Sequence, residues 1–162
     1  MNEKEMFLSS WEREFGTTMK VLKNLPANKL EFKPPGEKTR TAKQLAEVFV
    51  GELKLVDMAV KGKADFSGAM PTFKTYPEIL QALESTQKAM AQKVKGMSDA
   101  DFNSAMAMPV GPGKMGEMRR ADVLWMVLMD SVHHRGQFTI YLRMVGAKVP
   151  SIYGPSGDEP WM

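Results

Sequence analysis

The chain has no cysteine among its 162 residues and only two histidines. The absence of cysteine excludes disulfide bonds, thiolate metal sites and a cysteine nucleophile. No run of apolar residues is long enough to span a bilayer, and none near the start resembles a signal peptide. These absences favour a cytoplasmic protein without a membrane partner. Any metal ligands or general bases must then be sought among its histidines and carboxylates.

Charge is nearly balanced, with 22 basic against 19 acidic residues and a net charge of +3. The basic residues are scattered, whereas nucleic-acid binders gather them on one face or interleave them with aromatics. We therefore expect no nucleic-acid partner. The length and the 43% hydrophobic content are typical of one soluble domain. Most of the 15 methionines fall at helical core spacing and are interpreted as packing residues.

Apolar residues recur at spacings of three and four in four long segments, a pattern typical of amphipathic helices. These predicted helices cover about residues 4–25, 41–61, 75–97 and 119–145. No segment has a convincing strand pattern, and the proline and glycine of 103–116 predict a long flexible link. The tail, 147–162, contains three prolines and should be irregular but packed. The sequence thus predicts an all-α protein, a single antiparallel four-helix bundle domain over 1–162.

Three polar residues interrupt the apolar stripes of the second and fourth predicted helices. Asp130 and His134 lie one turn apart on the fourth helix, so their side chains project from one face. Glu52 lies in the middle of the stripe of the second helix. A buried carboxylate needs a partner or takes up a proton, because an unpaired buried charge is costly. Bundles build metal sites from such groups on two helices, so these three residues are candidate ligands of a divalent cation.

Other interpretations of these residues stay open. Asp130 and His134 alone would supply only two ligands, and a core histidine is more often satisfied by hydrogen bonds. The candidate partners for such bonds are Asp130 itself, Arg135, Gln137 and Arg143. His133 points about 100° away from His134 around the helix, so the two cannot easily share one metal. His133 is either a partly exposed helix residue or an acid or base at the rim of the site.

The segment HHRGQ at 133–137, followed by Tyr141-Leu142-Arg143 and Gly146, resembles the end of the last long helix in the DinB-like family. The approach to the second helix, from Leu25 to Leu45, and the tail VPSIYGPS at 149–156 are also similar to that family. These are damage-inducible-type proteins related to the bacillithiol- and mycothiol-dependent transferases. The resemblance covers nearly the whole chain. It implies a four-helix bundle, commonly dimeric, with a metal held by three histidines.

Two of the three metal-binding positions that the resemblance implies are altered here. The histidine pair of the family's last helix maps onto Asp130 and His134, so a carboxylate replaces one imidazole. The histidine of the second helix maps onto Val48, which cannot bind a metal. Glu52 lies one turn further along the same stripe and is the nearest replacement. The result is a site with two carboxylates and one histidine.

Two functions from different classes follow. In the first, Glu52, Asp130 and His134 hold one divalent metal, zinc or nickel, in a thiol-transferase or hydrolase-type enzyme, and His133 lies near the rim. In the second, the protein is a metal-free dimeric bundle with a small-molecule-binding or structural role, since Val48 removes an expected ligand. The expected partners are a second copy of the chain and a small-molecule or thiol substrate.

Overall fold

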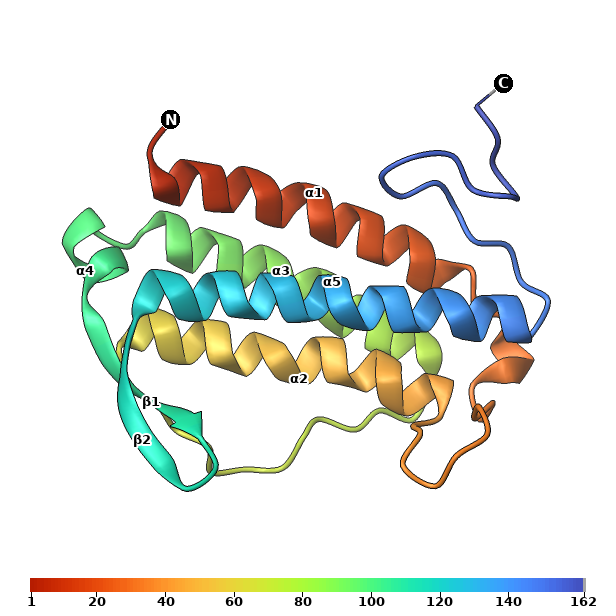
Figure 1. Ribbon diagram of the computed structural model, residues 1–162, viewed down its shortest axis with the longest axis horizontal. Coiled ribbons are helices and arrows are strands. Elements are labelled where there is room, and N and C mark those ends of the chain that lie inside the picture. The colour runs from red at the N-terminus through yellow and green to blue at the C-terminus, as the bar shows by residue number, and fades with distance from the viewer. Residues whose placement is uncertain (162) are drawn as a thin grey trace.

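Four long helices form the body of the structure, a computed structural model that describes residues 1–161 (Figure 1). They are α1 (Glu3–Lys23), α2 (Ala42–Lys61), α3 (Tyr76–Lys95) and α5 (Arg120–Met144). Each boundary lies within two residues of the predicted one. A short 3-10 turn (Ala27–Lys29) and the short helix α4 (Asp99–Asn103) lie in the connections. The prediction of a helical bundle is therefore confirmed.

Three of the long helices begin with the same capping arrangement. The side chains of Asn2, Thr41 and Thr75 each accept a hydrogen bond from the backbone N–H three residues later, and the side chain of that later residue bonds back. This reciprocal pair satisfies two backbone N–H groups that the first turn of a helix leaves free. At the other end of α2, Gly62 adopts the left-handed conformation with φ of 69°, which ends the helix.

The helices pack around one apolar core, with α2 against α3 and α5, and α1 against α3 and α5. Figure 1 shows α1 and α5 running in one direction and α2 and α3 in the other. The connection from α2 to α3 crosses the length of the bundle, which lets α3 run in the same direction as α2 (Figure 1). Within residues 1–161, none of the helices combines the length and the apolarity that a membrane crossing requires.

The prediction that residues 103–116 form a flexible link was wrong. Strands β1 (Ala105–Gly111) and β2 (Lys114–Arg119) pair in an antiparallel hairpin that leads directly into α5. Met106 and Met108 are buried, and Ala105 and Ala107, which alternate with them, are exposed. This alternation is the signature of a strand with one covered face. It spans too few residues to stand out beside the proline and glycines that interrupt the hairpin.

Two buried arginines attach α5 to its neighbours. Near the start of α5, the Nε of Arg120 donates to the carbonyl of Ala59 in α2 at 2.5 Å. Two-thirds of the way along, the guanidinium of Arg135 donates to the carboxylate of Glu14 in α1 at 2.8 Å and to the Glu14 carbonyl at 3.0 Å. Arg135 and Glu14 are both buried, so their charges neutralise each other inside the bundle.

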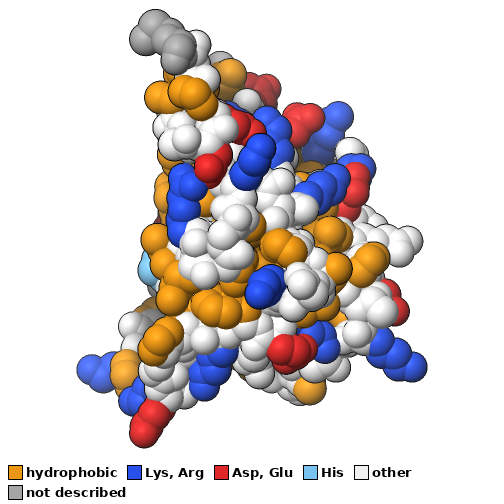
Figure 2. Space-filling model, turned by 90° about the vertical axis from the view of Figure 1, so that its right-hand side faces the viewer, with side chains coloured by type: hydrophobic (Ala, Val, Ile, Leu, Met, Phe, Trp, Pro, Cys, Tyr) orange, Lys and Arg blue, Asp and Glu red, His pale blue; other side chains and the backbone are white. Residues whose placement is uncertain are grey.

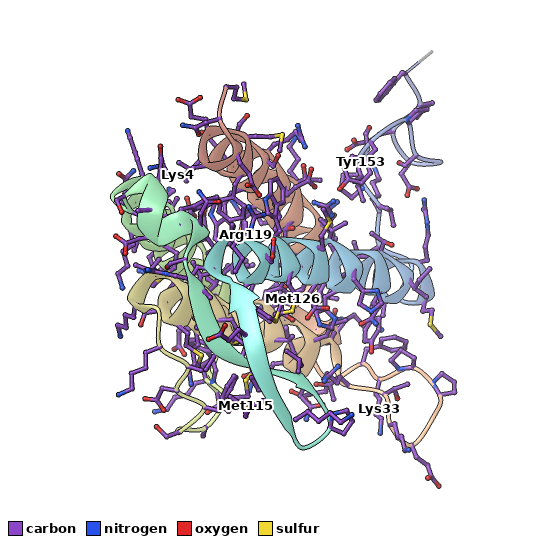
Figure 3. All side chains as sticks on the ribbon, turned by 60° about the vertical axis from the view of Figure 1, so that its left-hand side comes forward. Lys4, Lys33, Met115, Arg119, Met126 and Tyr153 are labelled. Carbon is purple, nitrogen blue, oxygen red and sulfur yellow. The ribbon has the colours of Figure 1, made fainter. Side chains whose placement is uncertain are left out.

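The tail contacts the bundle and completes this ion pair. Its Val149 is buried, as packing of the tail predicts, but Tyr153 and Trp161 stay 68% and 66% exposed. The hydroxyl of Tyr153 donates to the Glu14 carboxylate at 2.6 Å and accepts from Arg135 at 2.5 Å. Figure 3 labels Tyr153 where the tail returns toward α1 and α5. Burial alone would raise the pKa of Glu14, but the hydrogen bonds from Tyr153 and Arg135 lower that pKa overall.

Removing the Glu14 carboxylate should destabilise the fold, because it leaves the Arg135 guanidinium buried without its counter-charge. We expect Glu14→Ala to lower the free energy of unfolding by about 3 kcal/mol, measured by urea denaturation. Glu12→Ala removes an exposed carboxylate from the same helix and should change that free energy by less than about 0.5 kcal/mol. Equal losses in the two variants would show that the buried pair is not a major contributor.

Candidate metal centre

The structure brings Glu52 of α2 together with Asp130 and His134 of α5. The Nε2 atom of His134 lies 2.8 Å from Oε1 of Glu52 and 3.7 Å from Oδ1 of Asp130. One ligand atom from each residue lies within 4.8 Å of the other two. Atoms that bind one cation at about 2.0–2.2 Å are separated by distances of this order. The three residues that interrupt the apolar stripes therefore do converge.

The three side chains differ in their burial. The side chains of Glu52 and His134 are only 10% and 12% exposed, whereas that of Asp130 is 49% exposed. The expectation that Asp130 faces the core was wrong, because its place on α5 lies at the solvent edge of the buried stripe, among exposed residues. The cluster thus has a buried floor and an open rim. Figure 2 shows the pale blue edge of a histidine at the surface, beside a gathering of hydrophobic side chains.

Gln137 bonds to both histidines of the chain. Its side-chain oxygen lies 3.1 Å from Nδ1 of His134, and its nitrogen lies 2.8 Å from Nε2 of His133. With the amide in this orientation, Nδ1 of His134 carries the proton and Nε2 presents its lone pair to Glu52. A partner on the second ring nitrogen is the usual means of orienting a metal-binding histidine. Gln137, one of the candidate hydrogen-bond partners, therefore prepares His134 Nε2 for a ligand role.

The Glu52 carboxyl has an unusual environment. Burial, the negative charge of Asp130 and a hydrogen bond to Asp130 together raise the pKa of Glu52 to about 8, against an opposing effect of Arg40. Within the described residues, its buried Oε2 atom has no hydrogen-bond partner. A proton on Glu52 can be donated to His134 across the 2.8 Å contact, but that leaves the second oxygen unsatisfied. A cation bound to the Glu52 carboxylate would offset this buried, unpartnered oxygen, so the residues present fit a metal.

The remaining residues named from the sequence lie apart from this cluster or at its rim. His133 is exposed on α5, with its ring centroid 5.3 Å from that of His134, which fits both interpretations of this residue. Arg143 forms an ion pair with Asp158 in the tail, and Arg135 forms one with Glu14 in α1. Neither arginine therefore pairs with the cluster. Val48 lies half-buried on α2, one turn before Glu52.

Sequence reasoning missed Arg40, which lies in the loop before α2. The hydroxyl of Tyr141 on α5 donates to the Arg40 carbonyl at 2.9 Å and holds this loop against the helix. The loop thereby brings a positive charge within electrostatic reach of Glu52. The signal in the sequence was the position of Tyr141 on the apolar stripe of α5. A tyrosine hydroxyl that is partly buried needs a hydrogen-bond partner, and Arg40 supplies it through its carbonyl.

The fold and this cluster define a helical-bundle protein with a candidate carboxylate–histidine metal centre between α2 and α5. The profile of the DinB family matches residues 1–161. The chain belongs to the DinB family.

Individual relatives agree with this assignment. The uncharacterized protein YrdA of Bacillus subtilis (strain 168) is 26% identical over 157 residues, which cover 94% of this chain and 89% of YrdA. A DinB-like protein from Bacillus cereus ATCC 10987 superposes with a TM-score of 0.76 at 22% identity, over 92% of this chain and 97% of that one. YfiT from Bacillus subtilis, described as a probable metal-dependent hydrolase with an unusual four-helix bundle topology, has a TM-score of 0.64 at 13% identity, over 90% and 89%. These solved structures share the fold.

In the metal-free protein, the Glu52 contribution to stability should fall as the pH rises. The pKa of Glu52 is about 8 in the folded state against an ordinary 4.5, so the folded state retains a proton that the unfolded state has lost. The stabilising contribution is therefore complete below pH 4.5 and is lost as the pH rises through 8. Relative to Glu52→Gln, the wild type should lose on the order of 2 kcal/mol across this window in chelator-containing buffer. Parallel pH profiles of the two proteins in urea denaturation would refute this.

Proposed function

We propose that this DinB-family protein is a divalent-metal-dependent enzyme of the hydrolase or thiol-transferase type, with Glu52, Asp130 and His134 as the metal ligands. The observation that carries the proposal is the buried Oε2 of Glu52, which lacks a hydrogen-bond partner in the part of the chain that the structure describes. Two oxygens and one imidazole nitrogen form a donor set that suits zinc or nickel. The description of YfiT as a probable metal-dependent hydrolase on the same fold supports the reaction class.

Each residue has a distinct task in this proposal. Glu52 and Asp130 supply negative charge from opposite helices, and His134 supplies a neutral nitrogen whose ring Gln137 holds in place. A divalent cation with open coordination positions supplies Lewis-acid activation of a substrate carbonyl or of a water or thiol nucleophile. The open rim at Asp130 gives a substrate access. His133, exposed beside the cluster, is placed to exchange a proton with a bound substrate.

The alternative is a metal-free dimeric bundle that binds a small molecule or has a structural role. Two observations favour it. The 2.8 Å contact between Glu52 and His134 lets a protonated carboxyl and a neutral imidazole satisfy each other in the absence of metal. Val48, half-buried on α2, occupies the position where the family resemblance implies a histidine.

Metal content separates these two functions. Protein purified without a histidine tag and incubated with zinc or nickel should retain about one equivalent after dialysis, measured by mass spectrometry of the elements. Glu52→Ala and His134→Ala should weaken the affinity by a factor on the order of 100, because each removes a ligand atom. His133→Ala is the matched control, since it removes the neighbouring imidazole and should keep the metal. Wild-type protein that retains neither metal would contradict the metal-dependent function and favour the metal-free alternative.

We further propose that the protein is a homodimer that associates through Met126 and Met129 of α5 and the exposed apolar residues of the hairpin. Met126 and Met129 are exposed to solvent on α5 at a spacing of three. On the neighbouring hairpin, Val110 and Met115 are also exposed, and Figure 3 labels Met115 together with Met126 of α5. Apolar stripes of this extent commonly mark interfaces, and one helix face can pair with its own copy across a twofold axis.

Light scattering coupled to size-exclusion chromatography tests the dimer. The wild type should elute with twice the chain mass of 18.1 kDa, because pairing removes the stripe from water. The double variant Met126→Glu/Met129→Glu should elute as a monomer, since it places like charges on both copies of the stripe. Lys95→Glu, an exposed charge change on α3, should leave the dimer intact. A monomeric wild type would contradict the proposal.

A further inference from the structure

A hollow lies near the candidate metal centre, where α2 begins and the last turns of α5 run past it. Its volume is about 360 Å³. The loop before α2 lines it with Lys38 and Arg40, α2 lines it with Leu45, and α5 lines it with Gln137, Ile140 and Tyr141. We call this hollow the Arg40 pocket. It combines two cationic side chains, two apolar walls and a hydrogen-bonding amide.

The Arg40 pocket and the metal centre lie on the same two helices, about two turns apart. Leu45 precedes Glu52 by seven residues on α2, and Tyr141 follows His134 by seven on the antiparallel α5. At about 1.5 Å per residue, the pocket therefore lies roughly 10 Å along the helices from the metal centre. Gln137 belongs to both places, because it lines the pocket and bonds to His134. One extended small molecule can occupy both.

The positive charges of the pocket have no counter-charge of their own. Neither Lys38 nor Arg40 forms an ion pair with a carboxylate within residues 1–161. Both residues are exposed, and Glu37 is the adjacent acid in the loop. The bond from Tyr141 to the Arg40 carbonyl fixes the backbone that carries the guanidinium. A planar guanidinium on an anchored backbone is suited to bind a carboxylate through two parallel hydrogen bonds.

We propose that the Arg40 pocket binds the carboxylate end of an extended small-molecule substrate whose other end reaches Glu52, Asp130 and His134. Arg40 and Lys38 bind the carboxylate, and Leu45 and Ile140 contact the methylene carbons between the two ends. This inference rests on the proposed metal-dependent function and adds its substrate class, an aliphatic carboxylic acid with a second, reactive group about six atoms away. Arg40 and Lys38 are substrate-binding residues and lie outside the metal cluster.

Two hydroxamates of equal length provide the test with zinc-loaded protein. Adipic monohydroxamate has a metal-chelating group at one end and a carboxylate at the other, and hexanohydroxamate replaces the carboxylate by a methyl group. Wild-type protein should bind the first about 10-fold more tightly in calorimetry, and Arg40→Gln or Lys38→Gln should reduce that preference several-fold. Lys33→Gln is the matched control, because Lys33 is an exposed cation of the same loop that does not line the pocket. Equal affinities in wild-type protein, or an equal loss in Lys33→Gln, would overturn the proposal.

A metal-free arm separates failure of the pocket from failure of the metal centre. Adipate should shift the NMR signals of the Gln137 side-chain amide in metal-free wild-type protein, and 1,6-hexanediol should not. If the protein takes up no zinc and adipate still shifts these signals in an Arg40-dependent way, the metal function is wrong and the carboxylate pocket stands. If zinc binds and adipate causes no shift, the pocket is wrong and the metal function stands.

Discussion

The buried ion pair between Arg135 of α5 and Glu14 of α1 sets the orientation on which the candidate site depends. Arg135 and His134 are successive residues of one helix, so their side chains diverge by about 100°. Holding the guanidinium against α1 therefore turns the imidazole toward α2, where it meets Glu52 at 2.8 Å. Arg120 attaches the start of the same helix to α2 and limits its sliding. The HHRGQ segment thus places Arg135, which fixes the orientation of α5, directly beside His134 of the candidate site.

At the site itself, a proton and the proposed cation would compete for the same atoms. Without metal, Glu52 keeps its proton near neutral pH, since its surroundings are apolar and Asp130 is close. A divalent ion bound at this cluster, as proposed, would displace that proton and give the unsatisfied oxygen a partner. The negative charge of Asp130 would strengthen this coupling. Glu52 would then supply the ligand that the family resemblance implies at Val48.

Much of this arrangement could be predicted from the sequence, because it follows from helical periodicity. The spacing of apolar residues gives all four long helices, and the polar residues that interrupt it are Glu52, Asp130 and His134. The exposure of Asp130 was missed, because periodicity gives an angle around the helix and not the width of the buried stripe. The hairpin was missed because only Met106 and Met108 mark its covered face. The pairing of Glu14 with Arg135 joins residues 121 positions apart, and no local pattern reports such a contact.

The contact between the tail and the Glu14–Arg135 ion pair is expected to form late in folding. Tyr153 closes the Glu14–Arg135 pair from a position 139 residues away along the chain from Glu14. Contacts between the two extremes of a chain carry the greatest loop-closure cost and are expected to form late. Docking of the tail then adds Tyr153 to an ion pair that Arg135 and Glu14 already form between the helices. The orientation of α5 that aims His134 at Glu52 can therefore arise before the tail docks.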